Sequence, residues 1–508
     1  MENNKYKRMA KNAGMLYFRM LLTMAVALYT SRVILQTLGV EDFGIYNVVA
    51  GFVTMLGFLH GAMSSATQRF LAFELGQSGE KDVRGIFSMS MNIHILIAVI
   101  VLVVGETLGL WFVRTQMTIP IDRIFAAEWV FHLALLSFMV TIISVPYNAL
   151  IIAHEQMSIF AAVSILDVIL KLLIVFMLGW FGMDKLILYG LLSLTVVFII
   201  FMVYRSYCKT KFTESKFRFY WNRRLFNTML SYTGWNLWGN IAAVMGGQGV
   251  NILLNIFFGP TVNAARAIAM QVSAALNSFV QNLQVAINPQ IIKSYAAKDM
   301  DYMHSLVCYG AKYNFFLLFF LSMPVLINID LILQVWLGVV PEYTSIFIQL
   351  IIVNMLIDCV SAPLMTSAQA TGKIKLYQTL VGGLLLLNLP FSYIVLRMGY
   401  EPYTVIYVNI ILSVLALITR LCILKGLVSL PIYRYLKEVV GRGMVVSVMV
   451  GGLYYITYPY FIENLGFLLK SIVVCIYILS AIAVFGFSKV ERLAILDKIK
   501  AMLYKMHH

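Results

Sequence analysis

Charged side chains that lie inside long apolar stretches are the residues of this chain best placed to do chemistry. Four of them are cations: Arg19, Arg32, Arg266 and Lys312. An ionisable group in the hydrocarbon core of a membrane is costly, so its presence there points to a substrate or ion pathway by default. The alternative for Arg32 is that its long stem reaches the lipid headgroups, and we expect this for Arg69, which lies near the end of an apolar stretch.

Amides form two stripes in the longest apolar stretches. At 100° per residue, the first stripe occupies one third of a helix spanning 225–258. It contains Asn236, Asn240, Gln248, Asn251 and Asn255. The second stripe, in 263–292, contains Arg266, Ser273, Asn277, Gln281, Gln284 and Asn288. Such faces either line a hydrated cavity or bond to each other across packed helices, a contact worth about 0.6 to 2 kcal/mol.

Carboxylates are rare in the apolar stretches. Asp167 and Lys171 are four residues apart and share a helical face, so they form either a self-neutralising ion pair or a site for ion coupling or gating. Asp358 has no obvious partner in its own helix and could be protonated or face Lys171, Lys312 or a cavity. His60 is a further cavity candidate, although a lone histidine in a span more often packs through a hydrogen bond.

The elements that position these residues are membrane helices. The chain has 508 residues, of which 61% are hydrophobic and only 12% charged, whereas soluble domains are about a quarter charged. A helix needs roughly 20 apolar residues to cross a bilayer, and fourteen stretches qualify. They are 14–36, 43–68, 86–107, 125–152, 158–181, 185–204, 225–258, 263–292, 305–329, 345–370, 376–396, 402–424, 443–462 and 465–487.

Basic residues predict which side of the membrane each loop faces. If the N-terminus is cytoplasmic, 28 of the 38 Lys and Arg residues fall in cytoplasmic loops and termini. The net charge of +15 is therefore a topology signal rather than a nucleic-acid surface. We expect an N-lobe at 1–207, a basic cytoplasmic linker at 208–224, a C-lobe at 225–425, two further spans within 426–487 and an amphipathic cytoplasmic tail at 488–508.

Motifs for other chemistry are missing from the sequence. The five cysteines are scattered without a Cys-x-x-Cys pair, and the seven histidines lack metal-ligand spacing. No phosphate-binding glycine loop or nucleophile elbow occurs. We expect no enzyme activity, no metal and no cofactor.

An internal repeat organises the chain into two halves. Leu38-Gly39-Val40 and the following span match Phe258-Gly259-Pro260 and its following span, so that Gly39 aligns with Gly259. Pro146, seven residues before Ala153, matches Pro363, seven before Ala370. Duplication in a polytopic protein is typical of two-lobed transporters.

The segment Arg32-Val-Ile-Leu-Gln-Thr-Leu-Gly-Val-Glu-Asp-Phe-Gly44, followed by Ala66-Thr-Gln-Arg-Phe70 and a basic loop, resembles polysaccharide transporters of the multidrug, oligosaccharidyl-lipid and polysaccharide (MOP) exporter superfamily. The most similar branch contains the O-antigen repeat-unit flippases of lipopolysaccharide synthesis. This resemblance implies a MATE-like fold of two six-helix lobes plus two C-terminal helices, with the first, second, seventh and eighth spans lining a central cavity.

The resemblance also implies a function. The substrate would be a polyprenyl-diphosphate-linked oligosaccharide, moved from the inner to the outer leaflet of a bacterial cytoplasmic (inner) membrane by a monomer with both termini cytoplasmic. A polysaccharide polymerase and glycosyltransferases would be its partners beside membrane lipids. Arg19, Arg32, Arg266 and Lys312 would meet the diphosphate, and the amides the sugar.

Three alternatives remain open. A multidrug exporter has the same fold but should place acidic groups in the first lobe's cavity, whereas the first span offers arginines. A lipid II flippase would share the layout and the cationic cavity. An envelope polymerase or ligase should expose catalytic groups in a large outer loop, and the outer loops here are short.

Overall fold

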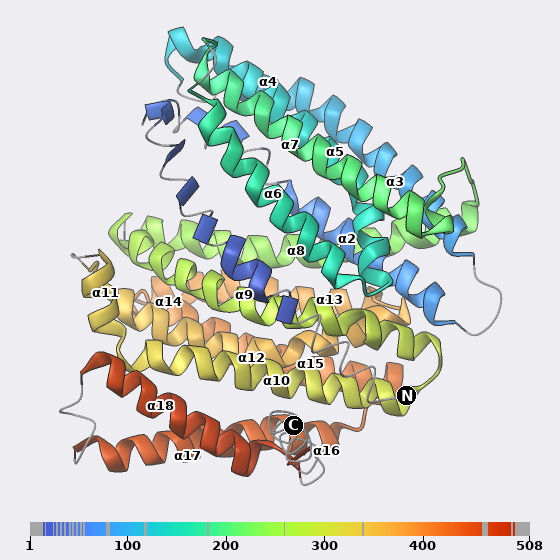
Figure 1. Ribbon diagram of the computed structural model, residues 1–508. Coiled ribbons are helices and arrows are strands. Elements are labelled where there is room, and N and C mark those ends of the chain that lie inside the picture. Colours follow the sequence, from blue (N-terminus) through green and yellow to red (C-terminus); the bar gives the residue numbers. More distant parts are fainter. Residues whose placement is uncertain are drawn as a thin grey trace, which may run out of the picture. The chain divides into compact units, whose positions relative to one another are not determined.

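A computed structural model describes most of the chain as helices, with no strand among the described residues (Figure 1). It describes residues 14–15, 17–23, 25–26, 29–30, 33–34, 37–39, 42, 45–46, 49–50, 53, 56–77, 82–115, 119–179, 182–258, 260–337, 340–459, 466–488 and 491–492. Ten helices in these ranges are long and apolar enough to cross a membrane. The all-helical, multi-pass membrane architecture expected from the sequence is confirmed.

The helices of the first repeat follow the apolar stretches. They are α2 (Gly57–Gly76), α3 (Val83–Val104), α4 (Leu110–Thr115), α5 (Ile124–Ala153), α6 (Met157–Met177) and α7 (Lys185–Lys211). A π-helical turn over Gly105–Gly109 joins α3 to α4, so these two form one span. The described residues between 14 and 50 are helical as well, as the first two predicted spans require.

The second repeat and the C-terminal extension contain eleven helices in the described ranges. They are α8 (Arg223–Phe258), α9 (Pro260–Ala296), α10 (Met300–Ile327), α11 (Ile329–Leu337), α12 (Thr344–Thr371), α13 (Lys375–Leu386), α14 (Asn388–Arg397), α15 (Thr404–Val428), α16 (Ile432–Tyr435), α17 (Arg442–Thr457) and α18 (Phe467–Ala481).

Two boundaries differ from the sequence prediction. The second span was predicted to end at residue 68, but α2 continues to Gly76 because its last two turns bury Phe70, Leu71 and Ala72. The eleventh span is interrupted at Leu387, between α13 and α14. By contrast α8 and α9, with 36 and 37 residues, are as long as expected. Neither is among the ten spans counted above.

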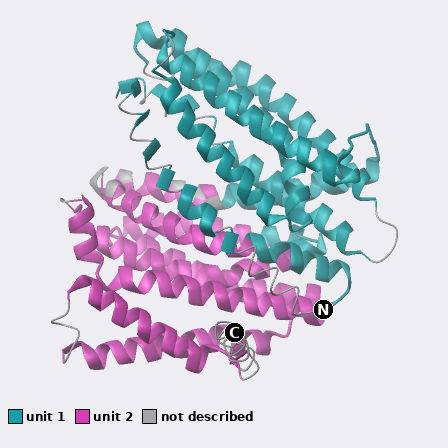
Figure 2. Ribbon diagram, viewed as in Figure 1, with its two compact units in different colours: residues 1–242, 285–300, 369–379 teal, residues 243–284, 301–368, 380–508 magenta. Residues whose placement is uncertain are grey.

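The chain divides into two compact units (Figure 2). Unit 1 contains residues 1–242, 285–300 and 369–379, and unit 2 contains 243–284, 301–368 and 380–508. Unit 1 therefore includes the end of α9 and the junction of α12 with α13, which belong to the second repeat. This division follows contacts rather than the duplication, and the predicted lobe boundaries stay a prediction.

Helix α5 is the centre of unit 1 and packs against α2, α3 and α7. Its last five residues, 149–153, are fully or almost fully buried and are small or aliphatic, which permits close packing on all sides. The 212–222 segment packs against the beginning of α3, where Arg84 Nε donates to the Lys216 carbonyl (3.0 Å) and Asn92 to the Tyr220 carbonyl (2.8 Å). The predicted linker thus lies beside the beginning of α3, at one end of unit 1.

In unit 2 the C-terminal helices α17 and α18 pack on α10. Phe316 and Phe319 of α10 share a buried cluster with Val446 and Val450 of α17 and with Ile478 of α18. The two extra spans are therefore held by an apolar seam.

Candidate functional site

A cavity of about 530 Å³ lies inside unit 1. Its wall is mostly aliphatic, with hydroxyls and one ion pair added by five elements: the first and second predicted spans, α5, α6 and α7. The polar lining residues are Thr23, Thr30, Tyr46, Ser137, Thr141, Asp167, Lys171, Tyr189 and Ser193. This size and this mixture are typical of a small-ligand site.

The predicted pair Asp167 and Lys171 lines this cavity from α6. Lys171 Nζ donates to Asp167 Oδ2 at 2.7 Å, so the two charges neutralise each other along one helical face. The Lys171 side chain is 55% exposed and the Asp167 side chain 28%, so the lysine is the more accessible charge. The cavity of unit 1 thus contains a carboxylate, that of Asp167, although the first span offers none. This carboxylate is already paired with Lys171.

Two tyrosines line the same cavity, and the sequence reasoning missed both. The rings of Tyr46 and Tyr189 meet edge to face with centroids 4.6 Å apart. The Tyr46 hydroxyl is hydrogen-bonded with the side chains of Tyr189 and Ser193. Tyr189 could have been found from the sequence, because it and Ser193 are hydroxyl-bearing residues four apart on one face of α7.

Arg19 lies beside α6. Its Nη1 donates to Ser164 Oγ at 3.3 Å, and its guanidinium lies 4.9 Å from the centre of the Phe160 ring. Ser164 and Asp167 are three residues apart on α6, so Arg19 approaches the helix that carries the ion pair. Arg32 lies outside the described residues.

Arg266 and Asn251 are brought together in unit 2. Arg266 is 9% exposed, and its Nη1 donates to the Gly247 carbonyl (3.2 Å) and to Asn251 Oδ1. The Nε atom of Arg266 is buried without a hydrogen-bond partner among the described residues. Burial therefore desolvates this cation, and the acceptors that bond it among the described residues are neutral. The side chains of Gln248 and Asn255, from the same stripe, are outside the description.

The amides of α9 and α8 differ in exposure. Asn277 and Gln281 lie one turn apart on α9 and are both exposed. Asn240 of α8 is half-buried, and its amide lies 3.7 Å from where a Cβ of Gly61 would be, directly after His60 on α2. These residues are accessible to a ligand.

Asn236 is placed differently. It is 3% exposed, and its Oδ1 accepts from Gln378 (3.3 Å) and Gln369 (3.5 Å) in the core of unit 1. Asn236 therefore contributes to packing between helices here, the alternative left open for the stripe.

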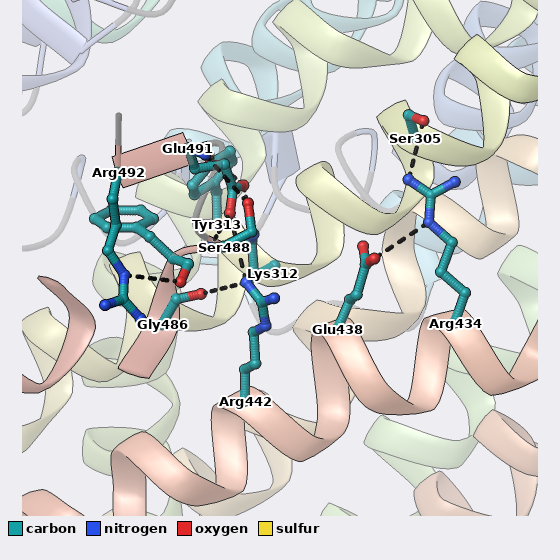
Figure 3. A network of polar contacts seen from close by, with 11 residues as sticks. Ser305, Lys312, Tyr313, Arg434, Glu438, Arg442, Gly486, Ser488, Glu491 and Arg492 are labelled. Atoms are coloured by element: carbon teal, nitrogen blue, oxygen red, sulfur yellow. Dashed lines mark hydrogen bonds and ion pairs between the residues drawn. The ribbon is translucent and has the colours of Figure 1, made fainter. Parts of the chain in front are cut away.

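Lys312 lies in a buried ion-pair network around Glu491 (Figure 3). Its Nζ donates to Glu491 Oε1 at 2.5 Å, Tyr313 donates to the same oxygen at 3.1 Å, and Arg442 lies 3.5 Å from Oε2. Glu491 and Ser488 also bond each other's backbone N–H groups, as in a capping box. Burial alone would raise the pKa of Glu491, but the hydrogen bonds from Lys312 and Ser488 hold it below its ordinary value. Lys312 thus anchors the start of the tail.

Asp358 has a partner in its own helix, contrary to the sequence interpretation. Asn354 Nδ2, one turn earlier on α12, donates to Asp358 Oδ2 at 2.8 Å. Ser413 of α15 also hydrogen-bonds the carboxyl group, and the charge of Arg420, on the same helix, acts on it. Asp358 thus faces α15 rather than Lys312.

Arg69 does not reach for the headgroups, so that prediction was wrong. It is 7% exposed, and its Nε and Nη2 donate to the carbonyls of Gln369 (3.2 Å) and Ala370 (2.9 Å) at the end of α12. The guanidinium lies between the rings of Phe70 and Phe73, 4.8 and 4.5 Å from their centres. The end of α2 is therefore tied to the end of α12.

No family model and no curated protein sequence matches the chain. Solved structures do match. An outward-facing multidrug resistance MATE family transporter of the MOP superfamily superposes with a TM-score of 0.69 at 13% identity, over 84% of this chain and 96% of its own. The chain has the MATE fold.

Two further structures with the MATE fold are informative. A MOP superfamily transporter from Pyrococcus furiosus Vc1, described as having a binding pocket of reverse polarity, matches with a TM-score of 0.67 at 13% identity, over 83% of this chain and 96% of that one. The MATE transporter ClbM in complex with Rb⁺ matches with a TM-score of 0.69 at 13% identity, over 82% and 94% of the two chains. The MATE fold thus occurs with pockets of different polarity.

Proposed function

We propose that this protein is a membrane transporter that moves a polyprenyl-diphosphate-linked oligosaccharide from the inner to the outer leaflet of a bacterial cytoplasmic membrane. The observation that carries this proposal is Arg266, a buried cation surrounded by the neutral acceptors Gly247 and Asn251. A desolvated guanidinium without a carboxylate is stabilised by an incoming anion, and its planar fork of donors suits a phosphate.

Other residues have supporting roles in this proposal. The exposed amides Asn277 and Gln281 on α9 supply donors and acceptors for sugar hydroxyls. Arg19 supplies a second cation in unit 1. The Asp167 and Lys171 pair lines the cavity of unit 1 and is suited to ion coupling, since a proton or metal cation that binds the carboxylate would release the lysine.

The membrane potential favours this direction of transport. With the cytoplasm negative, moving charge outward gains roughly 2.3 kcal/mol per elementary charge per 100 mV. A diphosphate that carries about two negative charges would therefore gain about 4 to 5 kcal/mol. Outward flipping of an anionic lipid needs no bond chemistry, and the glycosyltransferases and polymerase of polysaccharide synthesis would be its partners.

The test is a flipping assay on purified protein in lipid vesicles that contain a fluorescent polyprenyl-diphosphate oligosaccharide. Arg266→Ala should reduce the flipping rate to background, while Arg266→Lys, which keeps the charge and loses the fork, should retain part of it. Arg397→Ala, at an exposed arginine that ends α14, is the matched control and should flip at the wild-type rate. Full activity of Arg266→Ala would overturn the proposal.

A second candidate is export of organic cations, and Asp167 in the cavity of unit 1 is the observation that favours it. In this case Lys171→Ala, which frees the carboxylate, should increase efflux of a fluorescent cation, and Asp167→Asn should abolish it. Lipid II, supplied as the vesicle probe instead of the oligosaccharide lipid, tests the third possibility with the same protein.

A further inference from the structure

Helices α2 and α9, which are equivalent in the two repeats, cross at equivalent residues. Gly76 ends α2 and Ala296 ends α9, and they lie 220 residues apart, as do Gly39 and Gly259. A Cβ at Gly76 would lie 2.9 Å from the Ala296 Cβ and 2.7 Å from the Lys293 backbone. Equivalent ends of the two repeats therefore meet in this contact within unit 1.

On one side of this crossing, α2 reaches α12. The last carbonyls of a helix lack partners within the helix and carry its negative dipole end. Arg69 satisfies two of them, at Gln369 and Ala370, and Tyr232 donates to the Gln369 carbonyl as well (3.4 Å). This connection therefore joins the permanently charged guanidinium of Arg69 to backbone carbonyl oxygens of α12.

On the other side, α9 reaches the residue after α5. Gln290 Nε2 and Lys293 Nζ donate to the two carboxylate oxygens of Glu155, at 2.5 and 2.6 Å. The Glu155 side chain is 3% exposed, so its charge depends on these donors. Since α5 and α12 are equivalent in the repeat, the two connections are related by exchange of the halves.

Backbone geometry shows the same relation. Glu155 follows Ala153 by two residues and Gly372 follows Ala370 by two, and both residues are left-handed, with φ of 59° and 73°. A left-handed residue that is not glycine costs about 1 to 2 kcal/mol. Glycine at 372 leaves space for Arg69, because a Cβ there would lie 2.7 Å from Nη2. At 155 the strained backbone carries the carboxylate that α9 binds.

These contacts lie at the end of unit 1 where the basic segments gather. His154 Nε2 bonds Glu214 of the linker at 2.7 Å, and its ring stacks on Phe212. Burial lowers the pKa of His154 below its ordinary value although Glu214 opposes this, so the ring is neutral at pH 7 and Lys293 is the cation that balances Glu155. The basic linker predicts that this end is cytoplasmic.

We propose that the contacts of Arg69 with α12 and of Glu155 with Gln290 and Lys293 form a crossed latch that closes the cytoplasmic side of the transport path and opens once per cycle. The latch joins the end of each repeat's second helix to the end of the other repeat's fourth helix. The proposal rests on the transporter function proposed above, but not on the identity of the substrate.

The test measures accessibility rather than transport. A single cysteine replaces Gly61 in a background without the five native cysteines, and inside-out vesicles are treated with a membrane-impermeant maleimide. We expect slow labelling while the latch is closed. Arg69→Ala and Glu155→Gln should each increase the labelling rate roughly tenfold, the change expected when hydrogen bonds to a charged group are lost.

Two further variants separate a latch from simple misfolding. The exchange Glu155→Lys with Lys293→Glu should restore slow labelling, because the ion pair is re-formed. Arg84→Ala removes an arginine that bonds the linker and, among the described residues, makes no contact with the latch, so this variant should label like the parent. All variants should elute as single, unaggregated peaks in detergent.

A direct test fixes the latch closed. The rings of Phe73 and Tyr295 lie with centroids 6.3 Å apart, so a short bifunctional thiol reagent should join cysteines at these positions. The cross-linked protein should keep slow labelling at position 61 even with Glu155→Gln and should not transport.

Unchanged labelling in Arg69→Ala and Glu155→Gln would overturn the latch, as would transport by the cross-linked protein or failure of the charge exchange. Faster labelling in a protein that does not flip the oligosaccharide lipid would support the latch while overturning the proposed substrate.

Discussion

The two ends of unit 1 are held together in different ways. Where α5 begins, Arg123 bonds both Asp42 and Asp184 at 2.6 Å, and all three residues belong to the first repeat. Where α5 ends, Glu155 and Arg69 bond residues of the second repeat. Charged side chains thus unite one repeat at the first end and join two repeats at the second.

This difference indicates which end can separate without unfolding a repeat. The Arg123 cluster ties Asp42, which precedes the second predicted span, to the segments before α5 and α7. Breaking it therefore loosens the first repeat itself. The latch joins residues of different repeats inside unit 1, and the apolar cluster around it contains residues of both, such as Phe70 of α2, Ile292 of α9 and Ala370 of α12. Opening the latch therefore parts the two repeats and leaves the contacts within each repeat in place.

The first prediction concerns topology, because it decides which end of unit 1 faces the cytoplasm. If the sides of the membrane were assigned wrongly, the Arg123 cluster and not the latch would be cytoplasmic. Reporter fusions after residues 10, 215, 298 and 500 should all report cytoplasm, and a fusion after residue 183 should report the outside. This is an all-or-none result. An external signal at 215 or 298 would move the latch to the outer side and remove the two-repeat topology.

The next prediction concerns the glycine that admits Arg69. Gly372→Ala should destabilise the protein by about 1 to 2 kcal/mol through its left-handed backbone and by about 1.5 to 3 kcal/mol more through displacement of Arg69. Gly399→Ala is the matched control, because Gly399 has φ of 85° and no atom near its missing Cβ. Chemical unfolding in mixed micelles measures both. Equal losses would mean that Arg69 moves aside freely.

At the other end, Arg123→Ala should leave Asp42 and Asp184 without their cation. Because these side chains are partly exposed, the loss of stability should be smaller, about 1 to 2 kcal/mol. Labelling of a cysteine at position 61 from the cytoplasmic side should stay at the parent rate. An increase comparable with that of Glu155→Gln would show that the two ends are coupled and not independent.

The smallest expected effect is a dependence on pH. Burial alone would raise the pKa of Asp184, but its hydrogen bonds from Arg123 and from two backbone N–H groups hold it below its ordinary value. Its stabilising contribution should therefore be complete above the ordinary pKa of about 4 and disappear as the pH falls through the lowered value. Unfolding of the wild type and Asp184→Asn should differ at pH 5 to 8 and converge in stronger acid. A constant difference would contradict this.

Much of the architecture could be predicted from the sequence because membrane spans and duplication leave local signals. Apolar length gave the spans, including the unusual length of α8 and α9. The matched prolines Pro146 and Pro363 predicted that α5 and α12 are equivalent. This equivalence shows that the contacts of α2 with α12 and of α9 with the end of α5 are related by the repeat. The pairing of Asp167 with Lys171 also followed from their spacing.

Long-range partners could not be predicted in this way. The general expectation for an arginine near a span end is contact with headgroups, and it failed for Arg69 because its acceptors are backbone carbonyls 300 residues away. Every residue has a backbone carbonyl, so the residue types do not show which carbonyl will accept a hydrogen bond. Glu155 escaped notice because it lies outside the apolar spans, and only its left-handed backbone and its two donors reveal its importance.

The glycine at the crossing of α2 and α9 also sets how far the helices must move. Without a side chain at position 76, two backbones touch, so one helix can turn against the other with no side chain to climb over. Arg69 lies seven residues from Gly76, roughly 10 Å along the helix. A rotation of α2 by about 10° about this crossing would shift Arg69 by roughly 2 Å, enough to break its hydrogen bonds. The same rotation would move the far end of α2, about 30 Å away, by roughly 5 Å. One small rotation of α2 therefore breaks the hydrogen bonds of Arg69, close to the crossing, and moves the far end of the helix more than twice as far.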